Sequence, residues 1–284
     1  MKIGLVDDSA FMRMVLRQIF TTVDDIEVLW EAPDGDVAIK RNIEVEVDLI
    51  IADMEMPRCD GLQLLTKLKS SDVATECLII SSFHAHGGEK ILEAMRIGAA
   101  GFLPKSEIGV TVNLEEFRNR LIAWVHLFNQ EHLNKAPYEN ARGLISGVGT
   151  DALKSNADFL VIIGSAGSLG PLEEILTVCI DLERPLIVAV HMPTGLETKL
   201  ISRIFREIPL KNRPTIHFDH VQCSGRAVTI LRGGALSKLV KVNNKLRISY
   251  RSPNSQNDIF APNIDDFLDS CLAIGFLCDV VVLS

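Results

Sequence analysis

Three aspartates and one lysine in the first part of the chain have the types and positions needed to bind a cation and accept a phosphoryl group. Asp7 and Asp8 follow one apolar run, Asp53 ends another, and Lys105 follows a third. Carboxylates brought together repel one another, so a positive group should bind among them, and a hard divalent cation such as Mg²⁺ prefers oxygen ligands. Lys105 could neutralise an added phosphoryl group, and Asp53, flanked by the others, is placed to be the nucleophile.

A second group of residues suits acyl transfer. The apolar run 159–164 ends in a loop of glycines and serines that contains Ser165 and Ser168, and His191 directly follows the apolar run 185–190. A serine within reach of a histidine forms a nucleophile–base pair, and neighbouring glycines leave backbone N–H groups free for an oxyanion. The residue types alone do not decide between the two serines.

Each of these residues also has a purely structural explanation. An acid at the end of a strand often caps a turn or the following helix. A serine and a histidine in an α/β domain are more often part of the architecture than of an active site. The functional interpretation therefore depends on the complete sets of residues and on their order along the chain.

Short apolar runs alternate with amphipathic helical patterns over residues 1–105 and again over residues 158–284. Strands that alternate with helices predict parallel sheets with crossover helices. Residues just past the carboxyl ends of parallel strands converge on one crevice, which would bring each candidate set together. The predicted strands cover residues 2–6, 27–32, 48–53, 77–82, 101–105, 158–164, 185–190, 215–221, 227–232 and 278–284, with a hairpin over 238–251 that turns at Asn243–Asn244.

The predicted fold class is α/β with two domains, which suits a chain of 284 residues. A five-stranded parallel sheet is expected within residues 1–130, and a second, doubly wound α/β domain within residues 158–284. The polar stretch 131–157 is interpreted as the linker between them. The predicted helices cover residues 9–20, 34–43, 60–71, 89–98, 113–134, 171–182, 196–208 and 264–275.

Composition and charge exclude several classes of function. The formal net charge of −8 argues against nucleic acid as a partner, because neutralising phosphates needs clustered Lys and Arg. The locally basic segment 238–247 is better explained as a solvated hairpin. No early segment resembles a signal peptide, and no membrane insertion is expected, because Asp7 and Asp8 interrupt the first apolar run. The six cysteines form no C-x-x-C pair and are expected to be reduced thiols of a cytoplasmic protein.

Residues 1–105 resemble the response-regulator receiver family. The paired acids at Asp7 and Asp8 and the segment "DMEMP", which contains Asp53, carry the resemblance. It implies a flavodoxin-like domain in which Asp53 is the phospho-acceptor and a histidine kinase is the phosphodonor. It also implies a Mg²⁺ site formed by Asp8, Asp53 and the main-chain carbonyl of Glu55, with Asp7 nearby.

The same resemblance assigns switch residues near the carboxyl ends of the fourth and fifth strands. The hydroxyl switch corresponds to Ser81 in "IISS", the aromatic switch to Phe102, and the lysine of the family to Lys105. One departure concerns the residue after the lysine, which is commonly proline in the family and is Ser106 here. That departure affects the conformation expected for the loop and leaves the chemistry unchanged.

The second half resembles the methylesterase domain of chemotaxis-type protein-glutamate methylesterases, in which a receiver domain comes first. The segment "VAVHMPTGLETKLISRI" is similar to the family's histidine segment, so His191 is the implied base. "RGG" at residues 232–234 resembles the family's Gly-Gly turn, and "PNIDDFLDS" its helix start. The resemblance implies hydrolysis of glutamyl methyl esters, and deamidation of glutamines, on methylated chemoreceptors.

Two departures leave the activity open. In the family, the segment that contains the nucleophile has the sequence Ile-Gly-Ala-Ser-x-Gly-Gly. Residues 163–170 of this chain are Ile-Gly-Ser-Ala-Gly-Ser-Leu-Gly. A slip of one residue makes Ser165 the first choice of nucleophile and Ser168 the second. The family's catalytic aspartate follows the strand that matches "VVVLS", and the sequence stops at Ser284 before that loop, so the second domain is expected to be incomplete. The alternative to an active esterase is a catalytically degenerate signalling protein whose receiver accepts phosphate and whose second domain only binds partners.

Overall fold

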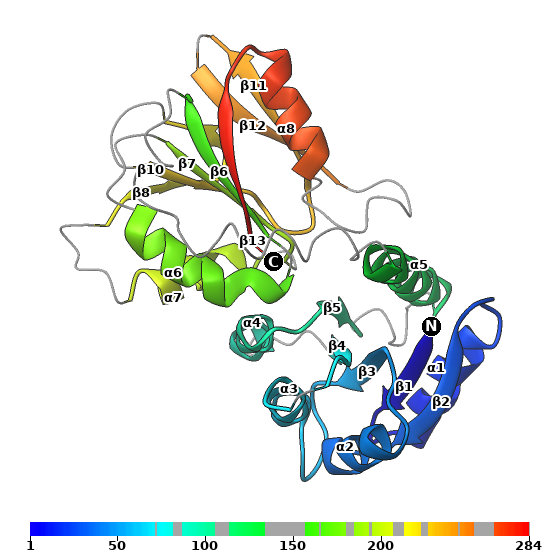
Figure 1. The fold of residues 1–284 in the computed structure, drawn as a ribbon. Coiled ribbons are helices and arrows are strands. Elements are labelled where there is room, and N and C mark those ends of the chain that lie inside the picture. Colours follow the sequence, from blue (N-terminus) through cyan, green and yellow to red (C-terminus); the bar gives the residue numbers. More distant parts are fainter. Residues whose placement is uncertain are drawn as a thin grey trace.

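Two open parallel sheets, one from each half of the sequence, organise the computed structural model (Figure 1). Helices cover both faces of the first sheet, and helices together with a small antiparallel sheet cover the second. No helix among the described residues is long and apolar enough to cross a membrane. The structure describes residues 1–71, 73–81, 87–105, 114–133, 157–164, 166–179, 185–192, 195–206, 213–222, 227–243, 245–252 and 264–283.

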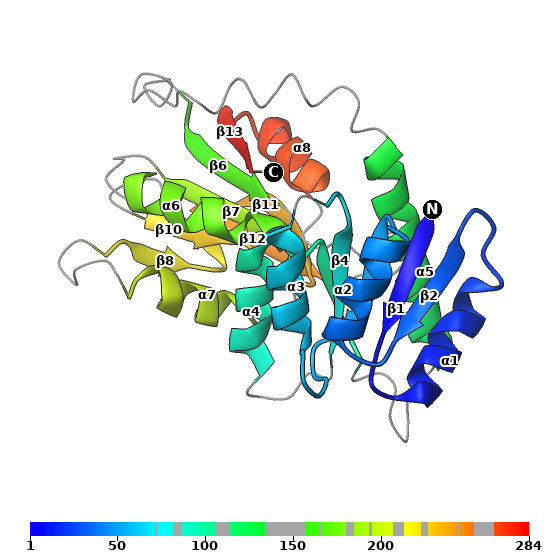
Figure 2. The same cartoon turned by 60° about the horizontal axis from the view of Figure 1, so that its bottom comes forward.

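The first sheet consists of five parallel strands. Their order across the sheet is β2 (Glu27–Ala32), β1 (Lys2–Val6), β3 (Leu49–Asp53), β4 (Glu76–Ser81) and β5 (Gly101–Pro104). The central strand β3 is buried along its whole length, as expected for a parallel strand with helices on both faces. One face is covered by α1 (Ala10–Phe20) and α5 (Leu114–Leu133), and the other by α2 (Gly35–Glu44), α3 (Gly61–Lys69) and α4 (Gly87–Ile97) (Figure 2).

Side-chain caps fix the starts of three helices of this domain. Ser9 caps α1, Asp34 caps α2, and Asp60 caps α3 in a reciprocal arrangement with Gln63. Each cap satisfies a backbone N–H group that has no partner within its own helix. The connections between strand ends and helix starts are thereby held in place, and one of them carries Asp7 and Asp8.

The second sheet also has five parallel strands. Their order is β13 (Cys278–Leu283), β6 (Phe159–Gly164), β7 (Leu186–Val190), β10 (Ala227–Ile230) and β8 (Thr215–His217). The short η2 turn (Ala166–Ser168), α6 (Leu169–Cys179) and α7 (Glu197–Ile204) lie on one side. The other face is covered by α8 (Ile264–Ala273) and by an antiparallel sheet of β11 (Leu236–Val242), β12 (Lys245–Arg251) and β9 (His220–Val221).

The alternation of strands and helices predicted from the sequence is confirmed in both halves, with most boundaries within a few residues. β11 and β12 form the predicted hairpin, and Asn243 at its turn has a φ of 49°, a left-handed conformation that asparagine adopts more readily than most residues. Asn244 lies outside the described residues, as does most of the expected linker 131–157, while α5 continues to Leu133.

One predicted strand, 215–221, is wrong as a single element. The chain bends at Phe218 and Asp219, so that β8 joins the parallel sheet and β9 joins the antiparallel sheet. Two contacts from β12 hold this bend, because Tyr250 Oη donates to the Phe218 carbonyl and Ile248 N–H donates to the Asp219 carbonyl at 2.8 Å. The break is imposed by a strand that comes later in the sequence, so local alternation could not reveal it.

The two halves pack on each other through α4, which lies between the first sheet and the helices α6 and α7 (Figures 1 and 2). Buried apolar side chains of α4, α6 and α7 belong to one continuous cluster. A methyl group placed on Gly167 in η2 would lie 3.3 Å from the carbonyl oxygen of Ala99, which precedes β5. The loop that follows β6 is therefore pressed closely against the first domain.

Candidate functional site

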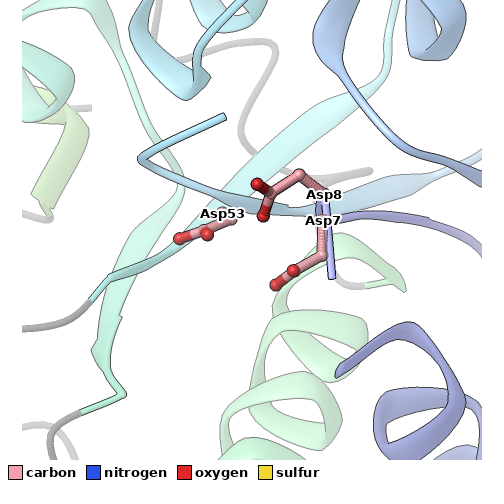
Figure 3. Close-up of side chains that lie close together, drawn as sticks. All are labelled: Asp7, Asp8 and Asp53. Atoms are coloured by element: carbon pink, nitrogen blue, oxygen red, sulfur yellow. The ribbon is translucent and has the colours of Figure 1, made fainter. Parts of the chain in front are cut away.

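The three aspartates predicted from the sequence lie together at the carboxyl ends of β1 and β3 (Figure 3). Carboxylate oxygens of Asp7, Asp8 and Asp53 all lie within 4.8 Å of one another. Asp7 and Asp53 are buried, whereas Asp8 is exposed and forms the open side of the group. We call this group, together with Lys105, the acid pocket.

Lys105 reaches the acid pocket from the end of β5. Its ammonium nitrogen lies 2.7 Å from Asp7 Oδ2 and 2.8 Å from Asp53 Oδ2, and the lysine side chain is only 11% exposed. Its backbone N–H donates to the carbonyl of Ser81 at 2.6 Å, which fixes the lysine beside the end of β4. A cation placed between two buried carboxylates offsets the repulsion that would otherwise oppose their burial.

Burial raises the pKa of the Asp53 carboxyl, and the Asp7 carboxylate nearby adds to that shift. The Lys105 ammonium and the backbone N–H of Glu55, which bonds to the Asp53 carboxylate, act in the opposite direction. A second cation in the pocket would favour the charged form further. The donor set is made of carboxylate oxygens only, with one exposed member, and it fits a hard cation such as Mg²⁺.

The predicted switch residues lie in β4 and β5, the two strands that follow β3 across the sheet. Ser81 is buried at the end of β4 and pairs with Pro104, and Phe102 in β5 is half-buried and pairs with Ile79. The exposed side chain of Glu55 lies 3.7 Å from Lys90 of α4, so the loop after β3 is linked to that helix. The structure thus brings together the three aspartates and Lys105, and it places Ser81 at the end of the strand beside β3.

The second candidate set lies where β6 and β7 end side by side. Gly164 is paired with Val190, and the backbone N–H of His191 donates to the Gly164 carbonyl at 3.2 Å. Ser168 is fully buried, and any side chain at Gly164 would overlap its hydroxyl. The structure therefore places both His191 and Ser168 next to Gly164. Ser165, the first choice of nucleophile, lies outside the described residues.

A buried carboxylate near this second set was missed by sequence reasoning. Glu197, the first residue of α7, is buried, and its Oε1 accepts the backbone N–H of Gly233 at 2.5 Å. Gly233 belongs to the "RGG" segment after β10, in which Gly234 has a φ of 65°. Glu197 thereby holds the third loop at this edge of the sheet, and a glutamate in the first turn of a helix gives no signal of such a role.

Sequence reasoning also missed a charged network that joins the two halves. Glu93 of α4 is bonded to Arg96 in its own helix and to Arg203 of α7, with 2.8 Å between Arg203 Nη2 and Glu93 Oε2. Arg203 Nε in turn lies 2.8 Å from Oε1 of Glu173 in α6. Hydrogen bonds from the two arginines lower the pKa of Glu93 to about 2, and Arg96 makes the larger contribution. Glu93 and Arg203 are 110 residues apart, so no local pattern predicts the pair.

Residues 3–112 match the family model of the response regulator receiver domain, a span that includes the whole acid pocket and both switch residues. A protein of Archaeoglobus fulgidus named protein-glutamate methylesterase/protein-glutamine glutaminase is 30% identical over 275 residues, which cover 95% of this chain and 76% of that protein. The chain belongs to this family. It is a response regulator of the chemotaxis methylesterase type.

Two further methylesterase/glutaminases illustrate how far the similarity extends. The Methanosarcina mazei protein is 33% identical over 67% of this chain, and the Geobacter sulfurreducens protein is 27% identical over 96% of it. The match covers 53% of the Methanosarcina mazei protein, so the chain spans about half the length of that relative. Among solved structures, the response regulator domain of Thermotoga maritima CheB is 31% identical over 45% of this chain and 94% of its own, with a TM-score of 0.41.

Proposed function

We propose that the chain is a phosphorylation-controlled hydrolase that cleaves glutamyl methyl esters, and deamidates glutamines, on chemoreceptors in the cytoplasm. The observation that carries the proposal is the packing of the loop after β6 against α4 and β5 of the receiver. That packing links the acid pocket to the neighbourhood of His191. Family membership supports the two reactions, and the four cysteines whose side chains the structure describes are free thiols, as expected in a reducing compartment.

In the receiver, Asp53 would accept a phosphoryl group from a phosphohistidine of the kinase. The carboxylate oxygen forms a bond to phosphorus, the P–N bond breaks, and the kinase imidazole leaves. Asp8, Asp53 and the carbonyl of Glu55 would hold Mg²⁺, which when bound supplies positive charge to the phosphoryl oxygens. Lys105, which now bonds to Asp7 and Asp53, would bond to the new phosphoryl group.

In the second domain, Ser165 would attack the ester carbonyl carbon of a methylated glutamate. His191 takes the hydroxyl proton and delivers it to the departing methoxide, so that methanol leaves and an acyl-serine remains. Water then attacks the acyl carbon with His191 as base, which releases glutamate and restores the serine. A glutamine side chain would lose ammonia in the same sequence of steps.

The acid pocket would control this reaction through β5 and α4. The backbone of Lys105 bonds to Ser81, and β5 leads back to Ala99, whose carbonyl faces Gly167. A rearrangement of Lys105 around a phosphoryl group would move this edge of the receiver. The contact with η2 and the Glu93–Arg203 pair would then weaken and expose the loop that carries Ser165.

A second candidate function is that of a degenerate signalling protein whose second domain only binds partners. The observation that favours it is the complete burial of Ser168, together with the departure of the loop sequence around it from the family's nucleophile segment. A serine without exposed surface cannot reach a receptor side chain in this arrangement. If Ser165 does not act as the nucleophile, the loop has no alternative that a substrate can approach.

One experiment separates the two candidates. The full chain is given radiolabelled acetyl phosphate and Mg²⁺, and both label uptake and methanol release from methylated receptor are measured. The proposed function predicts both signals, loss of both in Asp53→Asn, and loss of methanol alone in Ser165→Ala. Asp24→Asn, an exposed aspartate, serves as control. Label without methanol would favour the second candidate, and label that survives Asp53→Asn would overturn the assignment of the phospho-acceptor.

A further inference from the structure

The end of α8 and the start of β13 bring two cysteines together. After α8 the chain reverses through Gly275, which has a φ of 79°, and the backbone N–H of Phe276 donates to the carbonyl of Cys271 at 3.2 Å. β13 then begins at Cys278, which packs against the apolar cluster that contains Cys271, and each thiol shifts the pKa of the other. The tight turn therefore places the two sulfur atoms side by side.

Regular structure holds both cysteines in these positions. Cys271 lies in α8 and is fully buried in the core, and Cys278 packs against the same cluster and is partly exposed. Cys278 is in register with Phe159 of β6, and the ring of Phe159 stacks on Phe276 with 5.0 Å between centroids. Helix α8, the pairing of β13 with β6 and the stacked phenylalanine rings hold the two cysteines in place. Little further ordering is therefore needed before a bond can form between them.

We propose that Cys271 and Cys278 form a reversible disulfide, with a low-molecular-weight disulfide as the oxidant. Cys278 attacks first because it is the accessible thiol, and one sulfur of the oxidant leaves as a thiol. Cys271 then attacks the Cys278 sulfur of the mixed disulfide and displaces the second thiol. Two protein thiols and one small disulfide thus become one protein disulfide and two small thiols, and all hydrogens and electrons are accounted for.

The electrostatics of the pair agree with this order of attack. The neighbouring Cys271 thiol lowers the pKa of the Cys278 thiol, and the interaction with Cys278, together with burial, raises the pKa of Cys271. Because the thiolate is the attacking species, Cys278 is the nucleophile and Cys271 the resolving thiol. The charges of Asp158 and Asp279 act on Cys278 in the opposite direction, so a cationic disulfide should approach more readily than an anionic one.

The bond would fasten α8 to the strand that flanks the candidate nucleophile loop. β13 pairs with β6 along its whole length, from Cys278 beside Phe159 to Leu283 beside Gly164. Two other cysteines whose side chains the structure describes, Cys77 and Cys59, differ from this pair. Cys77 is completely buried, which raises its pKa to about 12, and Cys59 lies 3.6 Å from Lys67 Nζ, with no second thiol in contact among the described residues.

The test treats the full chain with cystamine, a cationic disulfide, and in parallel with glutathione disulfide, an anionic one. Remaining thiols are alkylated and the protein is cut with trypsin. No lysine or arginine follows Arg251, so one peptide, 252–284, carries Cys271 and Cys278 and no other cysteine. We expect this peptide to resist alkylation and to be lighter than its reduced form by two hydrogen atoms, with several-fold faster formation under cystamine.

Two variants complete the test. Cys278→Ala should leave Cys271 reduced and unmodified, because the buried thiol has no accessible partner, and Cys77→Ala should behave as wild type. Oxidised wild-type protein should also melt a few degrees higher than reduced protein, and dithiothreitol should reverse the shift. A peptide 252–284 that carries only mixed disulfides, or that is fully alkylated after oxidant has consumed other thiols, would overturn the proposal.

Discussion

The acid pocket and the loop after β6 lie at the same place in two similar sheets, yet they are held in different ways. Within the receiver, Lys105 bonds to both Asp7 and Asp53. The loop after β6 instead contains the fully buried Ser168, and its Gly167 lies against Ala99 of the receiver. The receiver site can therefore form without help from the second domain, whereas the accessibility of the second site depends on its neighbour.

The largest expected effect comes from removing the Lys105 ammonium group from the acid pocket. Lys105→Met leaves two buried carboxylates facing each other, and we expect a loss of about 3 kcal/mol in the free energy of unfolding of the receiver. Denaturant unfolding of the variant and the wild type in the absence of Mg²⁺ measures this loss in the free energy of unfolding. Adding Mg²⁺ should restore part of the loss.

The matched control for that variant is Lys90→Met. Lys90 and Glu55 form an exposed pair at 3.7 Å, so its removal should cost no more than about 0.5 kcal/mol. Equal losses in the two variants would show that Lys105 does not hold the acid pocket together.

A smaller effect is expected at the second site, where Glu197 fixes the Gly233 loop. Glu197→Gln retains an acceptor oxygen but loses the charge of a buried hydrogen bond, which should cost about 1–2 kcal/mol. Thermal unfolding compares it with Asp269→Asn, a change at an exposed residue of α8 that should be neutral. A neutral Glu197→Gln would mean that the loop is held by its backbone alone.

The smallest effect concerns the link between the two regions. Glu93 is a partly exposed carboxylate, so Glu93→Gln should cost about 1 kcal/mol at pH 7 after allowance for solvent screening. The folded-state pKa, about 2, lies below the ordinary value of 4.5, so this contribution is complete above pH 4.5 and declines as pH falls towards 2. Unfolding curves of both proteins between pH 7 and pH 3 should therefore converge, and a constant difference would contradict the assignment.

How much of this could be predicted from the sequence differs between the two regions for a physical reason. Asp53 ends one strand and Lys105 directly follows another strand of the same parallel sheet, and sheet geometry alone brings such residues together. Glu197 and Arg203 act through contacts with residues that are distant in sequence, at Gly233 and Glu93. Periodicity and strand-end positions carry no information about those contacts, and the bend at Phe218 escaped prediction for the same reason.

The most direct test of the account is hydrogen exchange of the full chain with and without beryllofluoride and Mg²⁺, which mimic a phosphoryl group on Asp53. Amides of α4 and of residues 166–179 should exchange several-fold faster in the activated protein, because the contact between Ala99 and Gly167 and the Glu93–Arg203 pair weaken. Asp53→Asn should show no change. Unchanged exchange at both segments, while the acid pocket itself becomes protected, would contradict the claim that the receiver controls the second site.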